Sequence, residues 1–408
     1  MKILIINQPG FNRGDESAHK ALIRTLLNRI PDVSIHVMSS PGLNESVRQY
    51  AIHDARVSYI TSPTHFLYSY IFENKGLRKG RRWLWNLHPF FYAYKRIFKW
   101  ADIVVCAPGG ICMGGFQDWN HLFYLLLAKF YNKPLAYYGR SFGPFPVETE
   151  SNRLFKKYSL EMLNYFSFLS IRDHQTELLA EDLKIPYIST VDTAFLDSPK
   201  TEIPYELAMQ IGDNPYVVFV PNYLLWHYAY KGRVSHEAIM YFYSRIADEL
   251  LGAYPDCNIV MLPQVFCGRE YALSDVDFFR DLAKVTECPR IIVTADCYSS
   301  DVQQTIIRNA KALFGSRYHS IVFAINQNVP FVALSYEHKI IGLLETLGKQ
   351  NCCIDITNTF DSDEKMSATI NTLKNMLPTI KNDANAQSKA KTIANNSMDA
   401  FVKIFVEK

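Results

Sequence analysis

An arginine and a histidine, Arg317 and His319, stand two positions apart between an apolar strand-like segment and an apolar helix-like segment. At the start of a helix, backbone N–H groups and the helix dipole favour a bound anion. A guanidinium there can bind a phosphate or a carboxylate, and an imidazole can transfer protons near neutral pH. We therefore interpret this pair as a candidate anion-binding and acid–base site. The alternative is that His319 only satisfies a hydrogen bond at a domain interface.

Three more cations follow apolar, strand-like segments elsewhere in the chain: Arg140, Arg172 and Lys339. An arginine that leaves a buried strand can bind a carboxylate or a phosphate through two parallel hydrogen bonds. For an arginine taken alone, a surface or interdomain salt bridge is the simpler explanation. Two arginines at two strand ends of one sheet favour a shared anion site.

A segment with two glycines follows the first apolar strand and contains Gly14, Asp15 and Glu16. The backbone N–H groups there and the positive end of the next helix suit an anion or a sugar. Asp15 has two interpretations: it acts on a ligand, or it only caps the helix while Gly14 allows the turn. The spacing matches neither the GxGxxG fingerprint nor the Walker A loop, so no nucleotide cofactor is expected.

A second glycine-rich segment, 108–119, follows another strand-like run. Its four glycines, Gly110 among them, would let the backbone approach a ligand closely. Gln117 and Asp118 would then be placed to bind hydroxyl groups. Asp118 has the alternative of capping the helix expected from Trp119.

The segments that carry these residues alternate between short β-branched runs and longer helical patterns. This alternation predicts parallel sheets covered by helices on both faces. Strands are expected at 2–7, 33–38, 102–107, 134–139, 168–172, 216–220, 258–262, 290–294, 312–314 and 331–335. Helices are expected at 17–29, 119–131, 148–165, 236–253, 274–284, 300–309 and 320–326. In such folds ligands bind at the carboxyl ends of the strands, which is where the candidate residues lie.

A chain of 408 residues exceeds the length at which a single hydrophobic core usually stops growing, so two domains are expected. The turn-rich stretch 196–215 separates an N-terminal Rossmann-like domain, 1–200, from a C-terminal one, 213–365. We expect an α/β architecture in which two doubly wound domains face a cleft. The polar, helical end, 366–408, is a candidate to pack back on the first domain.

The net charge of +3 hides a local basic stretch at 64–100, which has eight Lys or Arg, one acidic residue and many aromatics. The stretch carries +7, so the remainder of the chain carries −4. Cations mixed with Trp and Tyr are typical of a surface that contacts anionic membranes. The alternative is an insertion whose aromatics pack on the first domain. Nucleic acid is not an expected partner, because the rest of the chain offers no basic face.

The eight cysteines show no paired CxxC spacing, and several lie in or beside apolar runs. Reduced, mostly buried thiols in a cytoplasmic protein are the simplest interpretation, and no metal site is expected. No uncharged apolar run is long enough for a transmembrane helix. Oligomeric state does not follow from the sequence.

Taken together, the motifs resemble those of the polysaccharide pyruvyl transferase family, over most of the chain. The motifs that carry the resemblance are Gly14-Asp15-Glu16, the glycine loop before Gln117-Asp118, Gly139-Arg140-Ser141-Phe142-Gly143-Pro144, Ser170-Ile171-Arg172-Asp173, Val191-Asp192-Thr193-Ala194-Phe195, Gly315-Ser316-Arg317-Tyr318-His319-Ser320 and Ser335-Tyr336-Glu337-His338-Lys339. The middle residue of the Arg-x-His pair is usually aliphatic in the family and is Tyr318 here. His338, before Lys339, replaces the commoner proline.

The resemblance implies a GT-B-like fold and transfer of pyruvate from phosphoenolpyruvate, as co-substrate, to a sugar as a ketal. It implies that Arg317 and His319 bind and activate the donor. We further expect donor contacts from Arg172, Arg140, Lys339 and Ser320, catalysis by His319 with Asp15, and acceptor contacts from Glu16, Gly110, Gln117 and Asp118. The acceptor would be a saccharide, in some cases lipid-linked, which would place the protein at the inner face of the cell membrane.

Two other functions fit the same fold. A glycosyltransferase that uses a nucleotide sugar would need a ribose-binding carboxylate late in the second domain, where the sequence offers only Glu337 and Glu345 without a motif. A non-catalytic sugar- or anion-binding protein would need the candidate binding residues but not His319.

Overall fold

The computed structural model describes residues 1–10, 12–39, 44–63, 89–115, 117–227, 229–266, 274–294 and 296–407. Its contacts divide the chain into two compact units. Unit 1 comprises Met1–Gly10, Ala18–Asp197 and Thr392–Lys408, and unit 2 comprises Phe11–Ser17 and Ser198–Lys391. The predicted boundaries need two corrections: Phe11–Ser17 groups with unit 2, and only Thr392–Lys408 of the C-terminal stretch groups with unit 1.

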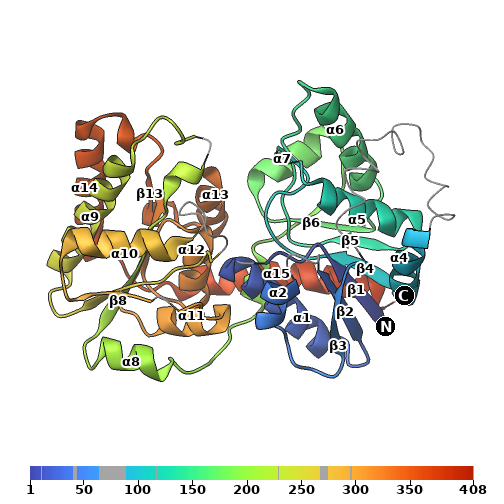
Figure 1. Ribbon diagram of the computed structural model, residues 1–408, viewed down its shortest axis with the longest axis horizontal. Coiled ribbons are helices and arrows are strands. Elements are labelled where there is room, and N and C mark those ends of the chain that lie inside the picture. The colour runs from blue at the N-terminus through green and yellow to red at the C-terminus, as the bar shows by residue number, and fades with distance from the viewer. Residues whose placement is uncertain are drawn as a thin grey trace. The chain divides into compact units, whose positions relative to one another are not determined.

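Unit 1 is built on a seven-stranded parallel sheet with the order β3-β2-β1-β4-β5-β6-β7 (Figure 1). Its strands are β1 (Lys2–Ile6), β2 (Ser34–Ser39), β3 (Val57–Thr61), β4 (Ile103–Cys106), β5 (Leu135–Tyr137), β6 (Phe168–Ile171) and β7 (Ile188–Ser189). The helices are α1 (Arg13–Arg29), α2 (Asn44–Gln49), α4 (Pro89–Trp100), α5 (Trp119–Phe130), α6 (Glu150–Leu163), α7 (His174–Asp182) and α15 (Ala384–Phe405). By the contact division, α1 begins in unit 2 and α15 ends in unit 1.

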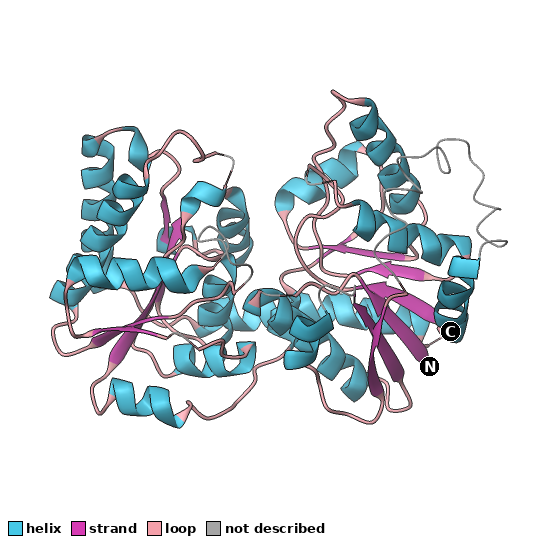
Figure 2. Cartoon of the chain, in the orientation of Figure 1, coloured by secondary structure: helices cyan, strands magenta, loops and turns pink. Residues whose placement is uncertain are grey.

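Helices bury both faces of this sheet, which explains why its central strands are continuously apolar (Figure 2). Along β1, Ile3 and Ile5 pack in one cluster with side chains of α1 and α15. The alternate residues, Leu4 and Ile6, pack in a second cluster with α4, α5 and α6. Successive strand side chains point to opposite faces, so both sets must be apolar when both faces are covered.

Unit 2 contains a six-stranded parallel sheet with the order β10-β9-β8-β11-β12-β13. Its strands are β8 (Tyr216–Val220), β9 (Asn258–Met261), β10 (Ile291–Val293), β11 (Leu313–Gly315), β12 (Phe331–Ser335) and β13 (Cys353–Asp355). The helices are α8 (Tyr205–Ile211), α9 (His236–Ala253), α10 (Asp275–Thr286), α11 (Ser300–Arg308), α12 (Tyr318–Asn326), α13 (His338–Leu347) and α14 (Asp363–Met376).

Both strand orders are those of a doubly wound, Rossmann-like sheet, in which the order reverses beside the first strand. The reversal lies between β1 and β4 in unit 1 and between β8 and β11 in unit 2. Ligands of such sheets bind outside the carboxyl ends of the strands at this point. Three strands were not predicted, β3, β7 and β13; all lie at sheet edges and are short or only partly buried, so they lack a continuous apolar run.

Candidate functional site

Arg317 and His319 lie where β11 leads into α12, at the strand-order reversal of unit 2. Arg317 is the N-cap residue of α12, and His319, 8% exposed, lies in the first turn of that helix. The predicted position at a helix start is therefore correct. The Arg317 guanidinium forms an ion pair with Asp275, the first residue of α10, and lies 5.9 Å from the ring centroid of Trp226.

Asp275 holds Arg317 in a largely buried setting. The Asp275 carboxylate is 1% exposed and also accepts hydrogen bonds of 3.0 Å from the backbone N–H groups of Gln264 and Val265. Burial is the largest single effect and lowers the pKa of Arg317, but the attraction and hydrogen bond of Asp275, together with the attraction of Tyr336 and Tyr243, raise that pKa above its usual value. Arg317 is thus a fixed cation, and its orientation is set by a residue from another helix.

The first turn of α1 belongs to unit 2 and packs against His319. The helix begins at Arg13, four residues before the predicted start, and the side chain of Asn12 accepts a 2.8 Å hydrogen bond from the Gly14 N–H. Because the cap is Asn12, the interpretation of Asp15 as the N-cap is wrong. Asp15 is partly exposed beside Gly14, and within the described residues its carboxylate forms no hydrogen bond or ion pair.

Glu16 anchors this first turn. Its carboxylate is fully buried, pairs with Arg13 at 2.6 Å, and accepts hydrogen bonds from the backbone N–H and hydroxyl of Ser300 at 2.9 and 3.1 Å. Ser300 is the first residue of α11. These contacts favour a structural role for Glu16, which fastens α1 to α11, over the predicted contact with an acceptor.

Gly14 has no room for a side chain, because a Cβ built on it would lie 1.9 Å from Cγ and Nδ1 of His319. Replacing glycine by alanine within a helix usually raises stability by up to about 1 kcal/mol. We expect the opposite sign for Gly14→Ala, a loss of about 1–3 kcal/mol, because the clash must displace the imidazole or the helix. Urea unfolding would measure the loss of stability. Any activity that depends on the position of His319 should fall as well.

The control for this prediction is Gly252→Ala. Gly252 lies in α9, and an added Cβ would meet no atom within 4 Å. This variant should be as stable as the parent or more so. Equal unfolding stability of the two variants would show that Gly14 does not pack closely against His319.

Arg140 lies at the strand-order reversal of unit 1. It is 1% exposed, and its guanidinium donates to the carbonyl oxygens of Ala107 at 2.7 Å, Gly110 at 3.3 Å and Asn7 at 3.4 Å. These carbonyls belong to the segments that follow β1 and β4, so Arg140 joins the two loops. Burial, and next the charge of Arg140, lower the pKa of the neighbouring His121 well below its usual value, which keeps that imidazole neutral.

Two further motifs of unit 1 meet through Arg172, which pairs with the buried carboxylate of Asp192. Asp192 also accepts a 3.0 Å hydrogen bond from the Ala194 N–H. Close by, Gly139 has a φ of +55°, and a Cβ there would lie 2.4 Å from the Thr193 hydroxyl oxygen. The motifs around 140, 172 and 192 thus form one packed cluster. A donor-binding role for Arg172 stays a prediction.

The second glycine loop also lies in unit 1. Asp118 is the N-cap of α5 and accepts a 2.9 Å hydrogen bond from the His121 N–H, so the capping interpretation is correct. Gln117 is partly exposed, with a φ of +48°. Gly110 is partly exposed, and nothing lies within 4 Å of a Cβ built on it, so its surface is open. Acceptor contacts at these residues stay predictions.

The two remaining predicted donor contacts lie in unit 2. Ser320 is fully buried, and its hydroxyl donates a 2.6 Å hydrogen bond to the Arg317 carbonyl oxygen, which closes the first turn of α12. Lys339, in the first turn of α13, pairs with Glu337 at 3.4 Å and is 27% exposed. Unit 2 therefore contains all five residues Asp15, Arg317, His319, Ser320 and Lys339, at or near the starts of helices.

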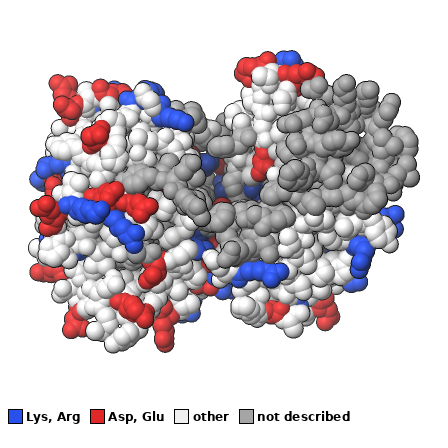
Figure 3. Space-filling model, viewed as in Figure 1, with Lys and Arg blue, Asp and Glu red and all other residues white. Residues whose placement is uncertain are grey.

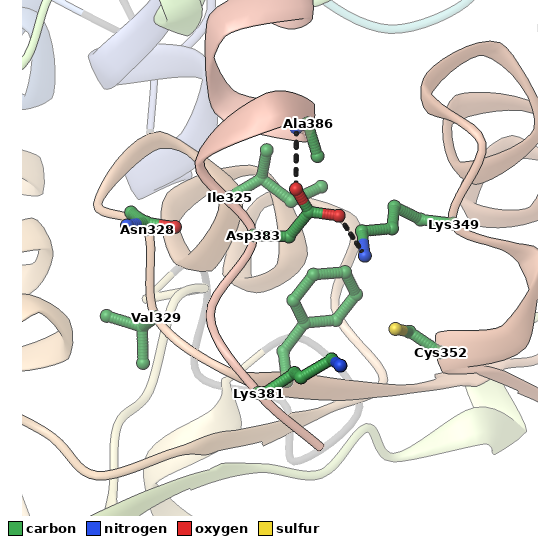
Figure 4. A pocket seen from close by; sticks show the side chains of 9 residues that line it. Ile325, Asn328, Val329, Lys349, Cys352, Lys381, Asp383 and Ala386 are labelled. Carbon is green, nitrogen blue, oxygen red and sulfur yellow. Dashed lines mark hydrogen bonds and ion pairs between the residues drawn. The ribbon is translucent and has the colours of Figure 1, made fainter. Parts of the chain in front are cut away.

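A small pocket lies elsewhere in unit 2 (Figure 4). Phe331 in its lining is the first residue of β12, so the pocket lies at the amino end of that strand, away from Arg317. Asp383 accepts from the N–H groups of Asn385 and Ala386 at the start of α15 and pairs with Lys349. The pocket is lined by Ile325, Asn328, Val329, Phe331, Lys349, Cys352, Lys381, Asp383 and Ala386.

The described part of the chain contains no group of three or more His, Cys, Asp or Glu side chains placed to hold a metal ion. Within the same ranges, no helix combines the length and the apolar character that crossing a membrane requires. The cysteines that the structure describes form no disulfide bond.

Two Rossmann-like units and a cluster of polar residues at strand ends define the class as a GT-B-like protein. A putative UDP-N-acetylglucosamine 2-epimerase from Listeria monocytogenes is similar, with a TM-score of 0.57, 13% identity and coverage of 100% of this chain and 97% of that chain. A UDP-GlcNAc 2-epimerase from Neisseria meningitidis bound to UDP-GlcNAc has a TM-score of 0.56 at 11% identity, with 100% of both chains covered. A ugt transferase from Siraitia grosvenorii in complex with UDP has a TM-score of 0.57 at 12% identity, with 98% of this chain and 99% of that chain covered. At these identities the likeness concerns the fold.

The model of the polysaccharide pyruvyl transferase family matches residues 12–338. The chain belongs to the polysaccharide pyruvyl transferase family. No curated protein sequence matches the chain. Membership of this family identifies the protein as a transferase.

Sequence reasoning missed Asp275 and Trp226, which contact Arg317. It also missed Gln264, which bonds to Asp275, and Ser300, which bonds to Glu16. Asp275 and Ser300 each begin a helix, where an acidic or hydroxyl residue is ordinary. No local signal distinguishes these residues from simple helix starts. Their partners lie far away in the chain, and only the folded structure shows them.

Proposed function

We propose that the protein transfers the pyruvate unit of phosphoenolpyruvate to a saccharide, forming a ketal and releasing phosphate. The observation that carries the proposal is the placement of Arg317 and His319 at the start of α12, in a chain that matches the family model over 12–338. A phosphate and a carboxylate close together require fixed cations, and Arg317 is one. Family membership is the reason for choosing phosphoenolpyruvate over other anions.

In this proposal His319 protonates the methylene carbon of the enol, which makes the adjacent carbon electrophilic. A sugar hydroxyl adds to that carbon and loses its proton. The bond to the phosphate oxygen breaks, a second hydroxyl of the sugar adds and loses its proton, and phosphate leaves as hydrogen phosphate. Asp15, partly exposed beside Gly14, is the proposed group that orients or deprotonates the first hydroxyl. Two new C–O bonds, one C–H bond on the former methylene and one O–H bond on the phosphate replace one C–O bond, the π bond of the enol and the O–H bonds of the two hydroxyls.

The experiment that tests this proposal is incubation with phosphoenolpyruvate and a series of glycosides, galactosides and mannosides first. Phosphate release should depend on the glycoside, and mass spectrometry should show a pyruvate ketal on it. Parallel incubation with UDP-GlcNAc and the same glycosides tests sugar transfer. Sugar transfer without ketal formation would contradict the proposal and identify the protein as a glycosyltransferase.

We further propose that the acceptor is lipid-linked and that the basic stretch 64–100 contacts an anionic membrane. Residues 64–88 lie outside the described residues, but most of α4 is described. Its Phe91, Tyr94 and Phe98 are buried in the core of unit 1, so these aromatics support packing, not insertion. Arg96 and Lys99 are exposed. On the face that Figure 3 shows, described basic and acidic side chains are otherwise interspersed.

The contact would therefore be electrostatic, worth about 1 kcal/mol per cation near an anionic surface. We expect the double variant Arg96→Ser, Lys99→Ser to float less than the parent with vesicles rich in phosphatidylserine. The difference between the two proteins should shrink at high salt. Lys156→Ser, Lys157→Ser, on α6, removes the same charge and should float like the parent. Equal flotation of the parent and both variants would exclude the membrane contact of α4. A parent protein that does not float with the vesicles would also exclude it.

A further inference from the structure

Three buried N–H groups around the Arg317 site have no acceptor within the described part of the chain. They are Nε of Arg13, Nε2 of Gln264 and Nε of Arg317. Gln264 is 1% exposed and Arg13 is 4% exposed, so solvent does not easily reach these groups. Gln264 lies three residues after the end of β9, the strand that pairs with the central strand β8.

Hydrogen bonds tie the three residues into one network with Gln264 in the middle. The Arg13 N–H donates to the Gln264 carbonyl oxygen at 3.0 Å. The Gln264 N–H donates at 3.0 Å to Oδ2 of Asp275, whose Oδ1 accepts from Nη2 of Arg317. The backbone of Gln264 is therefore fixed between Arg13 and Asp275, the partner of Arg317.

An amide N–H that is buried without an acceptor destabilises a protein, and nearly all buried polar groups have partners. The charges nearby are already balanced, because Arg13 pairs with Glu16 and Arg317 pairs with Asp275. What the network leaves unused is directional N–H donors. A ligand that completes it must bring acceptor oxygens, and an oxyanion brings several.

We propose that Gln264 is an oxyanion-binding residue: its Nε2 and the Nε of Arg317 donate to an anionic group of the co-substrate. The identity of the co-substrate as phosphoenolpyruvate rests on the proposed function, whereas the oxyanion site rests on the unused donors. A phosphate and a carboxylate both fit these donors, so the experiment uses each separately.

The test compares the parent protein with Gln264→Leu, which keeps the backbone bonds to Arg13 and Asp275. Calorimetric titration measures binding of inorganic phosphate, pyruvate and phosphoenolpyruvate. Gln264→Leu should weaken binding of phosphoenolpyruvate and of one of the two smaller anions about tenfold, the effect of one hydrogen bond to a charged group. Its unfolding midpoint in urea should stay the same or rise, because the lost amide had no partner.

Gln304→Leu is the matched control. Gln304 is also 1% exposed and lies in unit 2, but its amide donates to Ser17 and accepts from Asn326 and Gln327. This variant should unfold at lower urea and bind the anions like the parent. The two substitutions are thus expected to act in opposite ways on stability and on binding.

Unchanged anion binding in Gln264→Leu would overturn the inference, as would a loss of binding accompanied by a loss of stability like that of Gln304→Leu. A parent protein that binds none of the three anions would also overturn it. If the parent binds an anion through Gln264 but forms no ketal with any glycoside, the oxyanion site stands and the proposed pyruvyl transfer fails.

Discussion

His319→Ala should lower kcat for ketal formation about 10²-fold or more, the usual contribution of a general acid. His319 is 8% exposed, lies in the first turn of α12, and contacts the only part of α1 that groups with unit 2. Because the imidazole supplies a proton in the proposed mechanism, its loss should act on kcat more than on KM for phosphoenolpyruvate. Phosphate release in the presence of an active glycoside measures both constants.

The control is His174→Ala, since the His174 side chain is 61% exposed on α7 and pairs only at 3.6 Å with Glu177. It should leave kcat unchanged. Urea unfolding of His319→Ala shows whether lost packing against Gly14 contributes to the effect. Near-full turnover by a folded His319→Ala protein would remove His319 from the mechanism.

Much of the fold follows from the sequence because both sheets are buried on both faces. A strand such as β8 must then be apolar at every position, and such runs are visible without a structure. The same logic places polar residues after strands at the ligand-binding end, which is how Arg317 and His319 were found. Three edge strands, β3, β7 and β13, escaped prediction because they are short or only partly buried and so leave no such run.

The part that could not be predicted depends on contacts between distant segments. Glu16 follows Asp15 in a motif, which suggested a ligand contact, yet its partner Ser300 is 284 residues away. Helix α1 begins at Arg13, where Asn12 caps it. The glycine at position 14 instead favours a loop when only the local sequence is considered. Nothing in either local pattern shows that this turn belongs to the unit that carries His319.

Asp275→Ala should lower the free energy of unfolding by about 3–5 kcal/mol, as expected when one partner of a buried ion pair is removed. The Asp275 carboxylate is 1% exposed and the Arg317 side chain 14% exposed, so the guanidinium would lose its counter-charge in a poorly solvated place. The N–H groups of Gln264 and Val265 would also lose their acceptor. Urea unfolding followed by tryptophan fluorescence measures the change.

Asp277→Ala is the control, because Asp277 lies two positions further along α10 and pairs with Arg280 at 3.6 Å with both side chains more than half exposed. Its cost should stay below about 1 kcal/mol. Asp275→Asn separates charge from shape: it keeps an oxygen for the two backbone N–H groups but no longer neutralises Arg317. If Asp275 positions the cation that binds the donor, Asp275→Asn should raise KM for phosphoenolpyruvate while kcat changes less. An unfolding cost for Asp275→Ala as small as that for Asp277→Ala would mean that the buried pair does not hold Arg317 in place.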